Sequence, residues 1–447
     1  MTKTVAIVGA GPVGLAAAAH ALERGVEPMV LEAGEAAGDA VRQWSHVRMF
    51  SPWEYNIDKA AARMLASAGW NTPDPQSYPT GGELVSRYIA PLATRTALRE
   101  HIRTSARVTS IGRVGFDKAK SKGREAAPFE IRYRNGKGPE RFIADAVIDA
   151  SGTWRSPNPA GDNGLPAFGE LECAERLAYA MPDVLGRHRK RYAGRTVAVL
   201  GAGHSAIGTL IDLVKLKEAA EETEVLWLLR GPDPRKAFGG GANDKLSARG
   251  ELGTTFARLV NAGAIRVETG FHVTHVGLAN DHLRIGAGSA CCGRHVIADE
   301  LIVSTGFRPD MSHLAELRLG LDPALDCPTA LAPLIDPNEH SCGTVRPHGA
   351  RELAHPEVGF YIAGMKSYGR APTFLMLTGY EQVRSIIADI AGDKEAARRV
   401  ELVLPETGVC SREPLSEASG CCATPTTSET SACCATTPTK KPTTCCG

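Results

Sequence analysis

Two copies of one glycine-rich pattern constrain the fold of this chain more than any other feature of its sequence. The first copy spans residues 5–14 and contains Gly9, Gly11, Pro12 and Gly14, and the second spans residues 197–206 and contains Gly201, Gly203, Ser205 and Ala206. Each copy predicts a strand, a tight turn and the start of a helix. The first glycine permits the turn, the second lets the backbone approach a pyrophosphate, and the third small residue lets the helix pack on the strand. The chain is therefore expected to bind two dinucleotides.

The residues that follow each pattern distinguish the two expected nucleotides. After the first, a helix over residues 15–24 and a strand over residues 28–32 end in the acid Glu32, which is placed to bind the ribose hydroxyls of FAD or NAD. After the second, the strand over residues 224–230 ends in the base Arg230. A cation there suits a 2′-phosphate, so we expect FAD at the first site and NADPH at the second. The alternatives are a structural glycine turn in each copy and a solvated strand end for Arg230.

Length, composition and charge place limits on the class of protein. At 447 residues the chain is too long for one hydrophobic core, so two or three domains are expected. A hydrophobic fraction of 43% and a charged fraction of 23% are typical of a globular protein. The formal net charge of +1 gives no reason to expect nucleic acid or a membrane as a partner. The apolar stretch over residues 5–22 contains the glycines and His20, which do not suit a signal peptide, so a cytoplasmic protein is expected.

Changes in composition and motif along the chain predict four segments. Residues 1–160 form the first part of an FAD-binding domain, with strands near 106–111, 129–133 and 142–148 and a helix near 82–93. Residues 161–310 form an inserted NAD(P)H-binding domain, and residues 311–410 return to the FAD-binding domain with a helix near 378–391. Residues 411–447 cannot build a packed core from Thr, Ser, Pro, Ala and Cys, so a disordered tail is expected. The expected fold class is α/β, with two Rossmann-like domains and a cysteine-rich tail.

Three further short motifs complete a pattern that known flavoproteins share. They are Ala-Ser-Gly at 150–152, Ser-Thr-Gly-Phe-Arg-Pro-Asp at 304–310 and Ile-Ala-Gly at 362–364. With the glycine patterns, they make residues 1–400 resemble the flavoproteins that have two dinucleotide-binding domains, and among them the flavin-containing monooxygenases. The resemblance implies an FAD that NADPH reduces and that then captures dioxygen as a flavin hydroperoxide. It also implies cofactor contacts at Trp44, Val108, Ser151, Gly152 and Gly364.

The chain departs from that pattern in two places. Baeyer–Villiger and N-hydroxylating relatives carry a histidine just before the second glycine pattern, where this chain reads Phe168-Gly-Glu-Leu-Glu-Cys-Ala-Glu. Disulfide-reductase relatives carry an aspartate after the last Ile-Ala-Gly, where this chain has Met365. Neither signature is complete here.

The positions of the cysteines indicate which acceptor takes the electrons. Disulfide reductases need a Cys-x4-Cys or Cys-x2-Cys pair beside the flavin, and these domains contain neither. Residues 1–172 contain no cysteine, and the inserted segment has only Cys173 and the adjacent Cys291 and Cys292, which lie in an expected hairpin turn. Oxygen is therefore the favoured acceptor.

No catalytic triad is expected, because in a flavin oxygenase the cofactor reacts and the protein positions and shields it. Lys366, Tyr368 and Arg370 follow the last glycine turn and are candidates for stabilising reduced flavin, the alternative being ordinary loop residues. An aromatic cluster is expected either to line a substrate pocket or to pack in the core. Its members are Trp44, His46, Trp53 and Tyr55.

One irregular stretch gathers His340, Cys342, His348 and His355. Their spacings match no zinc template, so a solvent-facing loop is expected rather than a metal site.

Three adjacent cysteine pairs recur every 12 residues in the tail. They are Cys421 and Cys422, Cys433 and Cys434, and Cys445 and Cys446. A disulfide between neighbouring residues is strained, whereas two adjacent thiolates can converge on one soft ion such as trivalent arsenic, antimony or Hg(II). The alternative is a solvated tail with incidental or redox-buffering thiols. With the flavoprotein body, the tail makes the chain resemble the flavin monooxygenases encoded with bacterial arsenic-resistance genes.

These observations predict an FAD-dependent, NADPH-consuming monooxygenase that acts on a soft nucleophile, trivalent arsenic or an arsenical. The expected partners are dioxygen and a small-molecule or metalloid substrate, with a homodimer as an open alternative. Three other functions remain open. They are an NADPH-dependent metalloid or mercuric reductase, a metalloid-sequestering protein, and an N- or S-oxygenase of small metabolites.

Overall fold

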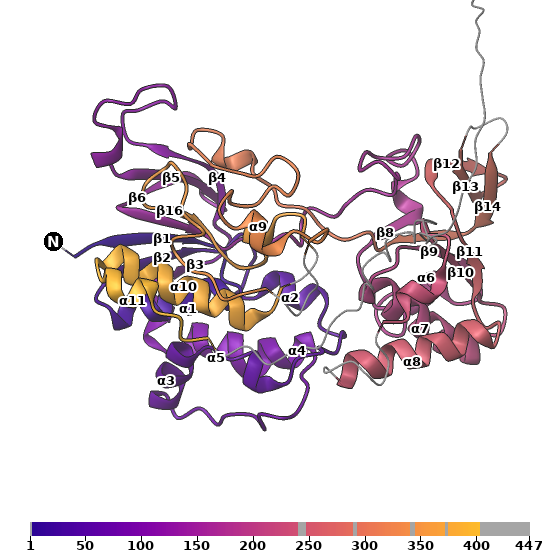
Figure 1. Cartoon of the computed structure of the whole chain (residues 1–447). Coiled ribbons are helices and arrows are strands. Elements are labelled where there is room, and N and C mark those ends of the chain that lie inside the picture. The colour runs from indigo at the N-terminus through magenta and orange to yellow at the C-terminus, as the bar shows by residue number, and fades with distance from the viewer. Residues whose placement is uncertain (1, 240–246, 289–292, 340–344, 372–373, 403–447) are drawn as a thin grey trace, which may run out of the picture. The chain divides into compact units, whose positions relative to one another are not determined.

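Two parallel β-sheets organise this chain, each within its own layered unit. The computed structural model describes residues 2–239, 247–288, 293–339, 345–371 and 374–402. In that part of the chain, each parallel sheet has five strands and is accompanied by a three-stranded antiparallel sheet (Figure 1). The predicted α/β class with two Rossmann-like units is confirmed.

The first parallel sheet has the strand order β16-β7-β1-β2-β3, with every neighbouring pair parallel. Its strands are β1 (Thr4–Val8), β2 (Glu27–Leu31), β3 (Ile102–Arg103), β7 (Ala146–Asp149) and β16 (Phe360–Ile362). The central strand β1 ends at Val8, which pairs with Leu31 on one side and Asp149 on the other. The carboxyl ends of three strands therefore meet at the first glycine pattern.

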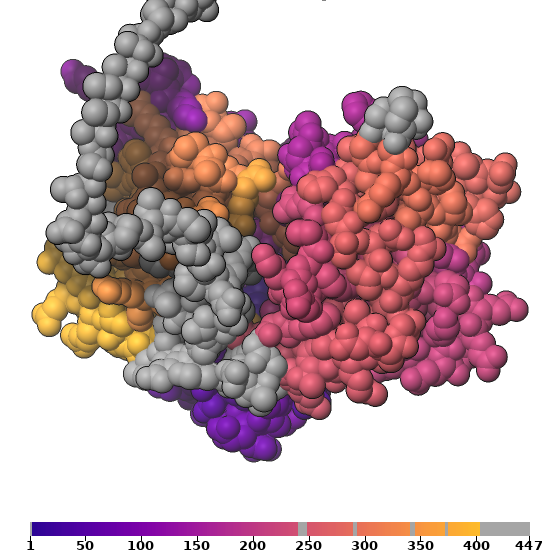
Figure 2. Space-filling model, turned by 45° about the vertical axis from the view of Figure 1, so that its right-hand side comes forward, coloured from indigo at the N-terminus to yellow at the C-terminus, as the bar shows by residue number. Residues whose placement is uncertain are grey.

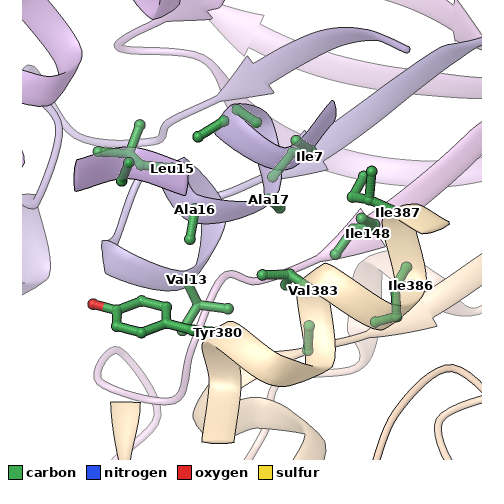
Figure 3. Close-up of a cluster of buried hydrophobic side chains, with 14 of the residues drawn as sticks. Ile7, Val13, Leu15, Ala16, Ala17, Ile148, Tyr380, Val383, Ile386 and Ile387 are labelled. Carbon is green, nitrogen blue, oxygen red and sulfur yellow. The ribbon is translucent and has the colours of Figure 1, made fainter. Parts of the chain in front are cut away.

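Two helices far apart in the sequence pack together on one face of this sheet. They are α1 (Pro12–Glu23) and α10 (Met376–Ala391). Helix α1 is apolar on nearly all sides, as expected for a buried helix, and its run of alanines allows close packing. Figure 3 shows the resulting cluster, whose labelled members are Ile7, Val13, Leu15, Ala16, Ala17, Ile148, Tyr380, Val383, Ile386 and Ile387.

The remaining helices of this unit are short. They are α2 (Asp39–Gln43), α3 (Lys59–Ser67), α4 (Gly81–Leu84), α5 (Ala90–Arg95), α9 (Ala332–Ile335) and α11 (Lys394–Arg398). The helix predicted near 82–93 is three pieces, because a π-helical turn over Val85–Ile89 separates α4 from α5. Pro91 has no N–H to donate to the carbonyl of Arg87, and the indole of Trp70 donates to that carbonyl instead, at 2.6 Å.

The first antiparallel sheet contains β4 (Arg107–Arg113), β5 (Phe129–Asn135) and β6 (Gly138–Ala144). The single strand predicted near 142–148 is wrong, since these residues belong to the end of β6 and to β7. The chain passes from one sheet to the other at Asp145, whose carboxylate accepts a hydrogen bond of 2.8 Å from the backbone N–H of Thr4.

The inserted segment repeats the same plan. Its parallel sheet has the order β11-β10-β9-β15-β8, with strands β8 (Leu177–Tyr179), β9 (Thr196–Leu200), β10 (Glu224–Leu228), β11 (Arg266–Glu268) and β15 (Glu300–Val303). Its helices are α6 (Arg189–Tyr192), α7 (His204–Ala219) and α8 (Ser247–Asn261). Its antiparallel sheet contains β12 (Val273–Ala279), β13 (His282–Ala287) and β14 (Arg294–Ala298). On the face shown in Figure 2, the magenta to coral atoms of this segment lie together.

A helix that crosses a bilayer needs about 20 predominantly apolar residues. Within the described ranges, no helix is both long enough and apolar enough to do so.

Candidate dinucleotide sites

The three glycines of the first pattern each occupy a different environment. Gly9 has a φ of +98°, and a Cβ built on it would lie 2.8 Å from the carbonyl oxygen of Ala150. A Cβ on Gly14 would lie 2.0 Å from the carbonyl oxygen of Gly9, so any side chain there would push α1 off the turn. A Cβ on Gly11 would meet no atom within 4 Å. The volume beside Gly11, at the N-terminus of α1, is therefore open where a pyrophosphate is expected.

Glu32 lies directly after β2 and is held by the backbone. Its side chain is 8% exposed, and its two carboxylate oxygens accept hydrogen bonds from Ala10 N–H at 2.8 Å and Gly34 N–H at 2.7 Å. An ionised carboxylate has about four acceptor positions, so two remain for other donors. The carboxylate is thus fixed beside the glycine turn with the capacity to accept ribose hydroxyls.

Asp149, which the sequence analysis did not single out, is the last residue of β7 and organises the next loop. Its Oδ1 accepts hydrogen bonds from the N–H of Ser151 at 3.0 Å and the hydroxyl of Ser151 at 2.6 Å. Its Oδ2 lies 2.6 Å from Nζ of Lys366 and 2.9 Å from Nε2 of His313. Burial raises the pKa of Asp149, but the Lys366 charge and the His313 hydrogen bond lower that pKa more, to a net value below the ordinary one. The sequence feature that could have indicated Asp149 is an acidic residue at the end of an apolar strand.

The candidate Lys366 is therefore a paired cation. It is 1% exposed, and its ammonium group donates to Asp149 and, at 3.1 Å, to the hydroxyl of Ser151. Tyr368 is 2% exposed, and burial raises the pKa of its phenol. Arg370 pairs with the carboxylate of Asp326 at 2.5 Å. All three side chains have protein partners or are buried.

A second polar network fixes the last glycine turn. The N–H of Gly364 donates to Oε1 of Gln382 at 2.8 Å, and Gly364 itself has a φ of +72° and lies against Val13 of α1. The amide nitrogen of Gln382 donates to the ring of His348 at 2.9 Å and to the hydroxyl of Ser367 at 2.9 Å. The turn after β16 is thereby fixed against the N-terminus of α1.

The solvent-facing loop predicted for the histidine-rich stretch is wrong for its two described members. His348 is 3% exposed and His355 is 8% exposed, and burial lowers the pKa of both imidazoles. His348 bonds to Gln382, and His355 packs against Phe360. His340 and Cys342 lie outside the described residues, and the described ranges contain no group of three or more side chains that could hold a metal ion.

The other residues expected at the flavin come from the end of α2, from β4 and from the loop after β7. Trp44 directly follows α2, and a Cβ on Gly81 would lie 2.6 Å from its ring, so the indole packs directly on that glycine. Val108 lies on β4 opposite Tyr133. Gly152 has a φ of +71° with no atom near a built Cβ. Trp53 is 1% exposed and belongs to the hydrophobic core, so it does not line a pocket.

The second glycine pattern reproduces the geometry of the first. Gly201 has a φ of +139°, and a Cβ on it would lie 2.3 Å from the carbonyl oxygen of Ser304. A Cβ on Gly203 would meet no atom within 4 Å, as at Gly11. Ala206 is fully buried one turn into α7, where it takes the place of the third glycine, and Ser205 is half-buried before it. Each turn therefore leaves an open space at the N-terminus of the helix that follows it.

Arg230 follows β10 at the carboxyl edge of the second parallel sheet. Its side chain is exposed and donates one hydrogen bond of 3.1 Å to the carbonyl oxygen of Asp162. A guanidinium has five N–H donors, so this bond leaves it able to bind a phosphate.

The thiols of the described residues are not placed for redox chemistry. Cys173 and Cys327 are buried and free, and burial raises the pKa of both, that of Cys327 to about 12. A thiol with a raised pKa is a poor nucleophile at neutral pH. Cys291, Cys292 and the six tail cysteines (Cys421, Cys422, Cys433, Cys434, Cys445 and Cys446) lie outside the described residues.

A surface hollow of about 670 Å³ lies on the β4–β5–β6 sheet, lined by charged residues such as Glu130, Arg132 and Arg141. Its lining includes neither glycine pattern nor α2. We do not assign it to a nucleotide.

Comparison with known proteins agrees with this geometry. The sequence profile of the pyridine nucleotide-disulphide oxidoreductases matches residues 6–330. This chain belongs to that family. Its members are oxidoreductases that use a pyridine nucleotide, and this chain uses FAD and NADPH. The assignment of FAD to the first glycine turn and of NADPH to the second stays a prediction.

Individual relatives within and around the family are more distant. Human flavin-containing monooxygenase 1 is 28% identical over 222 residues, which is 49% of this chain and 39% of that protein. The flavin-containing monooxygenase FMO GS-OX-like 2 of Arabidopsis thaliana is 22% identical over 299 residues, which is 61% of this chain and 60% of that protein. The chain thus spans about two fifths to three fifths of the length of these relatives.

Solved structures show the same fold at low identity. The bacillithiol disulfide reductase Bdr (YpdA) of Bacillus cereus has a TM-score of 0.64 at 21% identity, with 88% of this chain and 99% of that chain covered. The FAD-bound cadaverine monooxygenase DfoA of Erwinia amylovora has a TM-score of 0.60 at 12% identity, with 91% and 99% covered. The flavin-containing monooxygenase of Stenotrophomonas maltophilia has a TM-score of 0.53 at 20% identity, with 88% and 98% covered. The family fold is therefore shared by reductases and monooxygenases.

The position of Arg230 leads to a test of nucleotide preference. We expect Arg230→Ala to raise the KM for NADPH about 10- to 100-fold, since a hydrogen bond to a charged group contributes about 1.5–3 kcal/mol. The KM for NADH should not change, because NADH has no 2′-phosphate. Steady-state oxidation of both nucleotides measures the effect. Arg266→Ala is the control, because Arg266 begins β11 and pairs with Glu268. An equal effect of Arg230→Ala on both nucleotides would contradict the assignment.

Proposed function

We propose that this flavoprotein is a monooxygenase that transfers one oxygen atom from dioxygen to a soft nucleophile, trivalent arsenic or an arsenical. For arsenite the balanced reaction converts arsenous acid, NADPH, one proton and dioxygen to arsenic acid, NADP⁺ and water. Two electrons come from NADPH and two from the arsenic lone pair. One atom of dioxygen enters arsenic acid and the other enters water. Bound FAD supplies the redox chemistry between the nucleotide and oxygen.

The positions of the thiols favour this proposal over the alternative that the enzyme reduces a disulfide. A disulfide reductase of this fold needs two exchangeable sulfurs beside the flavin. Residues 1–172 contain no cysteine, and the two cysteines of the described ranges are buried. The fold itself does not discriminate, since the similar structures include both classes.

The side chains of the first site hold the cofactor and do not act as acids or bases. In this proposal Glu32 orients the ribose, the turn at Gly11 admits the pyrophosphate, and the Asp149–Lys366 pair fixes the Ser151 loop. The hydrogen bonds that hold Glu32, Ser151 and Lys366 in place support these roles. A lone-pair nucleophile needs no general base, which agrees with the buried and paired side chains around the last glycine turn. The choice of a soft substrate rests on the three cysteine pairs of the tail.

Coupling between NADPH oxidation and substrate oxidation tests the proposed activity. We expect arsenite or methylarsenite to accelerate NADPH oxidation in air and to lower the yield of hydrogen peroxide, with one oxidised arsenical formed per NADPH. Oxygen electrode, peroxide assay and arsenic speciation measure the three quantities. Peroxide equal to NADPH consumed at every arsenical concentration would rule out these substrates.

Removal of residues 411–447 tests the role of the tail in the same assay. Because tethered thiols raise the local concentration of a captured ligand, we expect the apparent KM for the arsenical to rise about 10-fold and kcat to stay unchanged. A sequestering protein would instead lose metalloid binding entirely and show no turnover in either form.

The second candidate is an NADPH-dependent metalloid or mercuric reductase, which the tail cysteines favour. It predicts anaerobic oxidation of NADPH by Hg(II) or As(V), whereas the proposed monooxygenase requires oxygen. The same assay under argon separates the two. An N- or S-oxygenase of small metabolites would couple to amines or sulfides and ignore arsenicals.

A further inference from the structure

Helix α2 is too short to fix its own orientation. It has only five residues, Asp39–Gln43, and a helix of that length has little stability by itself. Contacts with other segments therefore decide where it lies. Its position matters, since it leads from the FAD turn to Trp44.

The two ends of α2 are attached to the FAD-binding unit. At its start, Gly38 has a φ of +75°, and its N–H donates to the carbonyl oxygen of Ala10 in the glycine turn at 2.9 Å. A Cβ on Gly34 would lie 2.2 Å from the Cβ of Asp39, and the N–H of Gly34 binds Glu32. At its end, Trp44 packs on Gly81. A rotation of α2 would therefore disturb the turn and the residues around Glu32.

The side of α2 is clamped by two consecutive residues of another segment. Arg155 donates to Oδ2 of Asp39 at 2.7 Å, and the indole N–H of Trp154 donates to Oε1 of Gln43 at 2.9 Å. The amide of Gln43 donates to Oδ2 of Asp39 at 3.3 Å. These three hydrogen bonds link four side chains, and the peptide bond between Trp154 and Arg155 closes the ring. Asp39 and Gln43 are four residues apart and share one face of the helix, so a dipeptide can reach both.

Trp154 and Arg155 belong to the segment that leads out of the FAD-binding unit, and this segment is paired with the one that returns. The N–H of Asn158 donates to the carbonyl oxygen of Gly306 at 2.9 Å, and the N–H of Arg308 donates to the carbonyl oxygen of Ser156 at 3.0 Å. The ring of Trp154 stacks on Phe307 with centroids 5.0 Å apart. Trp154 thus joins its own outgoing segment to α2 and to the returning segment.

We propose that Trp154 and Arg155 are positioning residues for flavin reduction, because they fix α2 and Trp44 relative to the paired segments that connect the two dinucleotide-binding units. Neither residue belongs to a nucleotide motif. Trp154 and Arg155 act through α2. The geometry of hydride transfer from NADPH therefore depends on the ring that they form with Asp39 and Gln43. The proposal rests on FAD and NADPH as cofactors and not on the identity of the final acceptor.

Anaerobic reduction of the flavin by saturating NADPH, followed by stopped-flow absorbance, tests this proposal. We expect Arg155→Ala and Trp154→Phe each to lower the reduction rate about 10-fold, because small misplacements of reacting groups have effects of that size or larger. The KM for NADPH and the FAD content should stay unchanged. Arg155→Lys should recover part of the rate. Arg132→Ala, which removes an exposed arginine on β5, is the matched control and should have no effect.

Hydrogen–deuterium exchange of the protein without FAD supplies a readout that is independent of activity. We expect the amides of residues 38–44 to exchange faster in Arg155→Ala and Trp154→Phe than in the unmodified chain, and the control variant to match the unmodified chain.

A double variant tests whether Trp154 acts through α2. Gln43→Leu removes the same hydrogen bond as Trp154→Phe, so the variant with both changes should be no slower in flavin reduction than the slower single variant.

Unchanged reduction rates, unchanged exchange at residues 38–44, or rates that fall only in proportion to lost FAD would each overturn the positioning role. None of these measurements involves oxygen or an arsenical. Failure of the clamp and failure of the proposed monooxygenase activity are therefore distinguishable.

Discussion

Gly11→Val is expected to yield a folded protein without FAD, and Gly203→Val a folded protein that holds FAD but no longer binds NADPH. A Cβ at either position meets no protein atom within 4 Å, and neither glycine has a positive φ, so the substitution does not strain the fold. The added side chain instead fills the volume in which the backbone should approach a pyrophosphate. We expect affinity for the corresponding cofactor to fall at least about 100-fold, which corresponds to about 2.8 kcal/mol.

The flavin absorbance of purified protein and NADPH titration measure the two losses. Gly136→Val is the matched control, because Gly136 lies in the turn between β5 and β6 and a Cβ there also meets nothing within 4 Å. Gly14→Val should behave differently and prevent folding, since its Cβ would lie 2.0 Å from the carbonyl oxygen of Gly9. If Gly11→Val contained as much flavin as the unmodified chain, the first turn would not be the pyrophosphate site.

Lys366→Met is expected to lower the free energy of unfolding by about 3–5 kcal/mol at pH 7, the usual effect of removing one partner from a buried ion pair. His313 and Ser151 remain as polar partners of Asp149. Asp149 is fully buried and Lys366 is 1% exposed, so water cannot replace the lost cation. Asp149→Asn in the same background should restore part of the loss, because a neutral amide is less costly to bury than a carboxylate. Urea unfolding followed by circular dichroism measures the three proteins.

The pH dependence of the same measurement has a defined sign. Burial raises the pKa of Asp149, but Lys366 and His313 lower it to a net value below the ordinary carboxyl value. A depressed pKa in the folded state gives stability that is present above about pH 4, the unfolded value, and is lost as the pH falls below it. The difference between the unmodified chain and Lys366→Met should therefore be largest at pH 7 and narrow below about pH 4. A difference that stays constant from pH 7 to pH 3 would contradict the pairing.

Local spacing was enough to predict the two nucleotide turns. The structure shows a close backbone contact that requires a glycine at Gly9 and at Gly14, and it leaves the space beside Gly11 open. Glu32 was predicted for the same reason, since it ends the strand that follows. The strand predicted over residues 142–148 failed, because the break at Asp145 depends on a contact with Thr4 far along the chain.

The residues that support the first candidate site depend on contacts between segments that are far apart in the sequence. Asp149 meets Lys366, 217 positions later, and Gly364 meets Gln382 on a helix that also packs on α1. His348 was expected in solvent, but the carboxamide of Gln382 makes a polar partner available inside the core, so the imidazole is buried. The roles of Lys366 and His348 therefore changed once their partners were known.

The order of the residues is enough to predict two glycine turns, with an acid after the first and a base after the second. It also shows that no cysteine precedes residue 173. These are short-range properties, because a turn, a strand end or a missing thiol depends on neighbouring residues. The neutralisation of Lys366 by Asp149, the burial of His348 and the clamp that Trp154 and Arg155 form on α2 required the tertiary structure. Each of them joins segments that meet only when sheets and helices pack, because burial and ion pairing are properties of the folded neighbourhood.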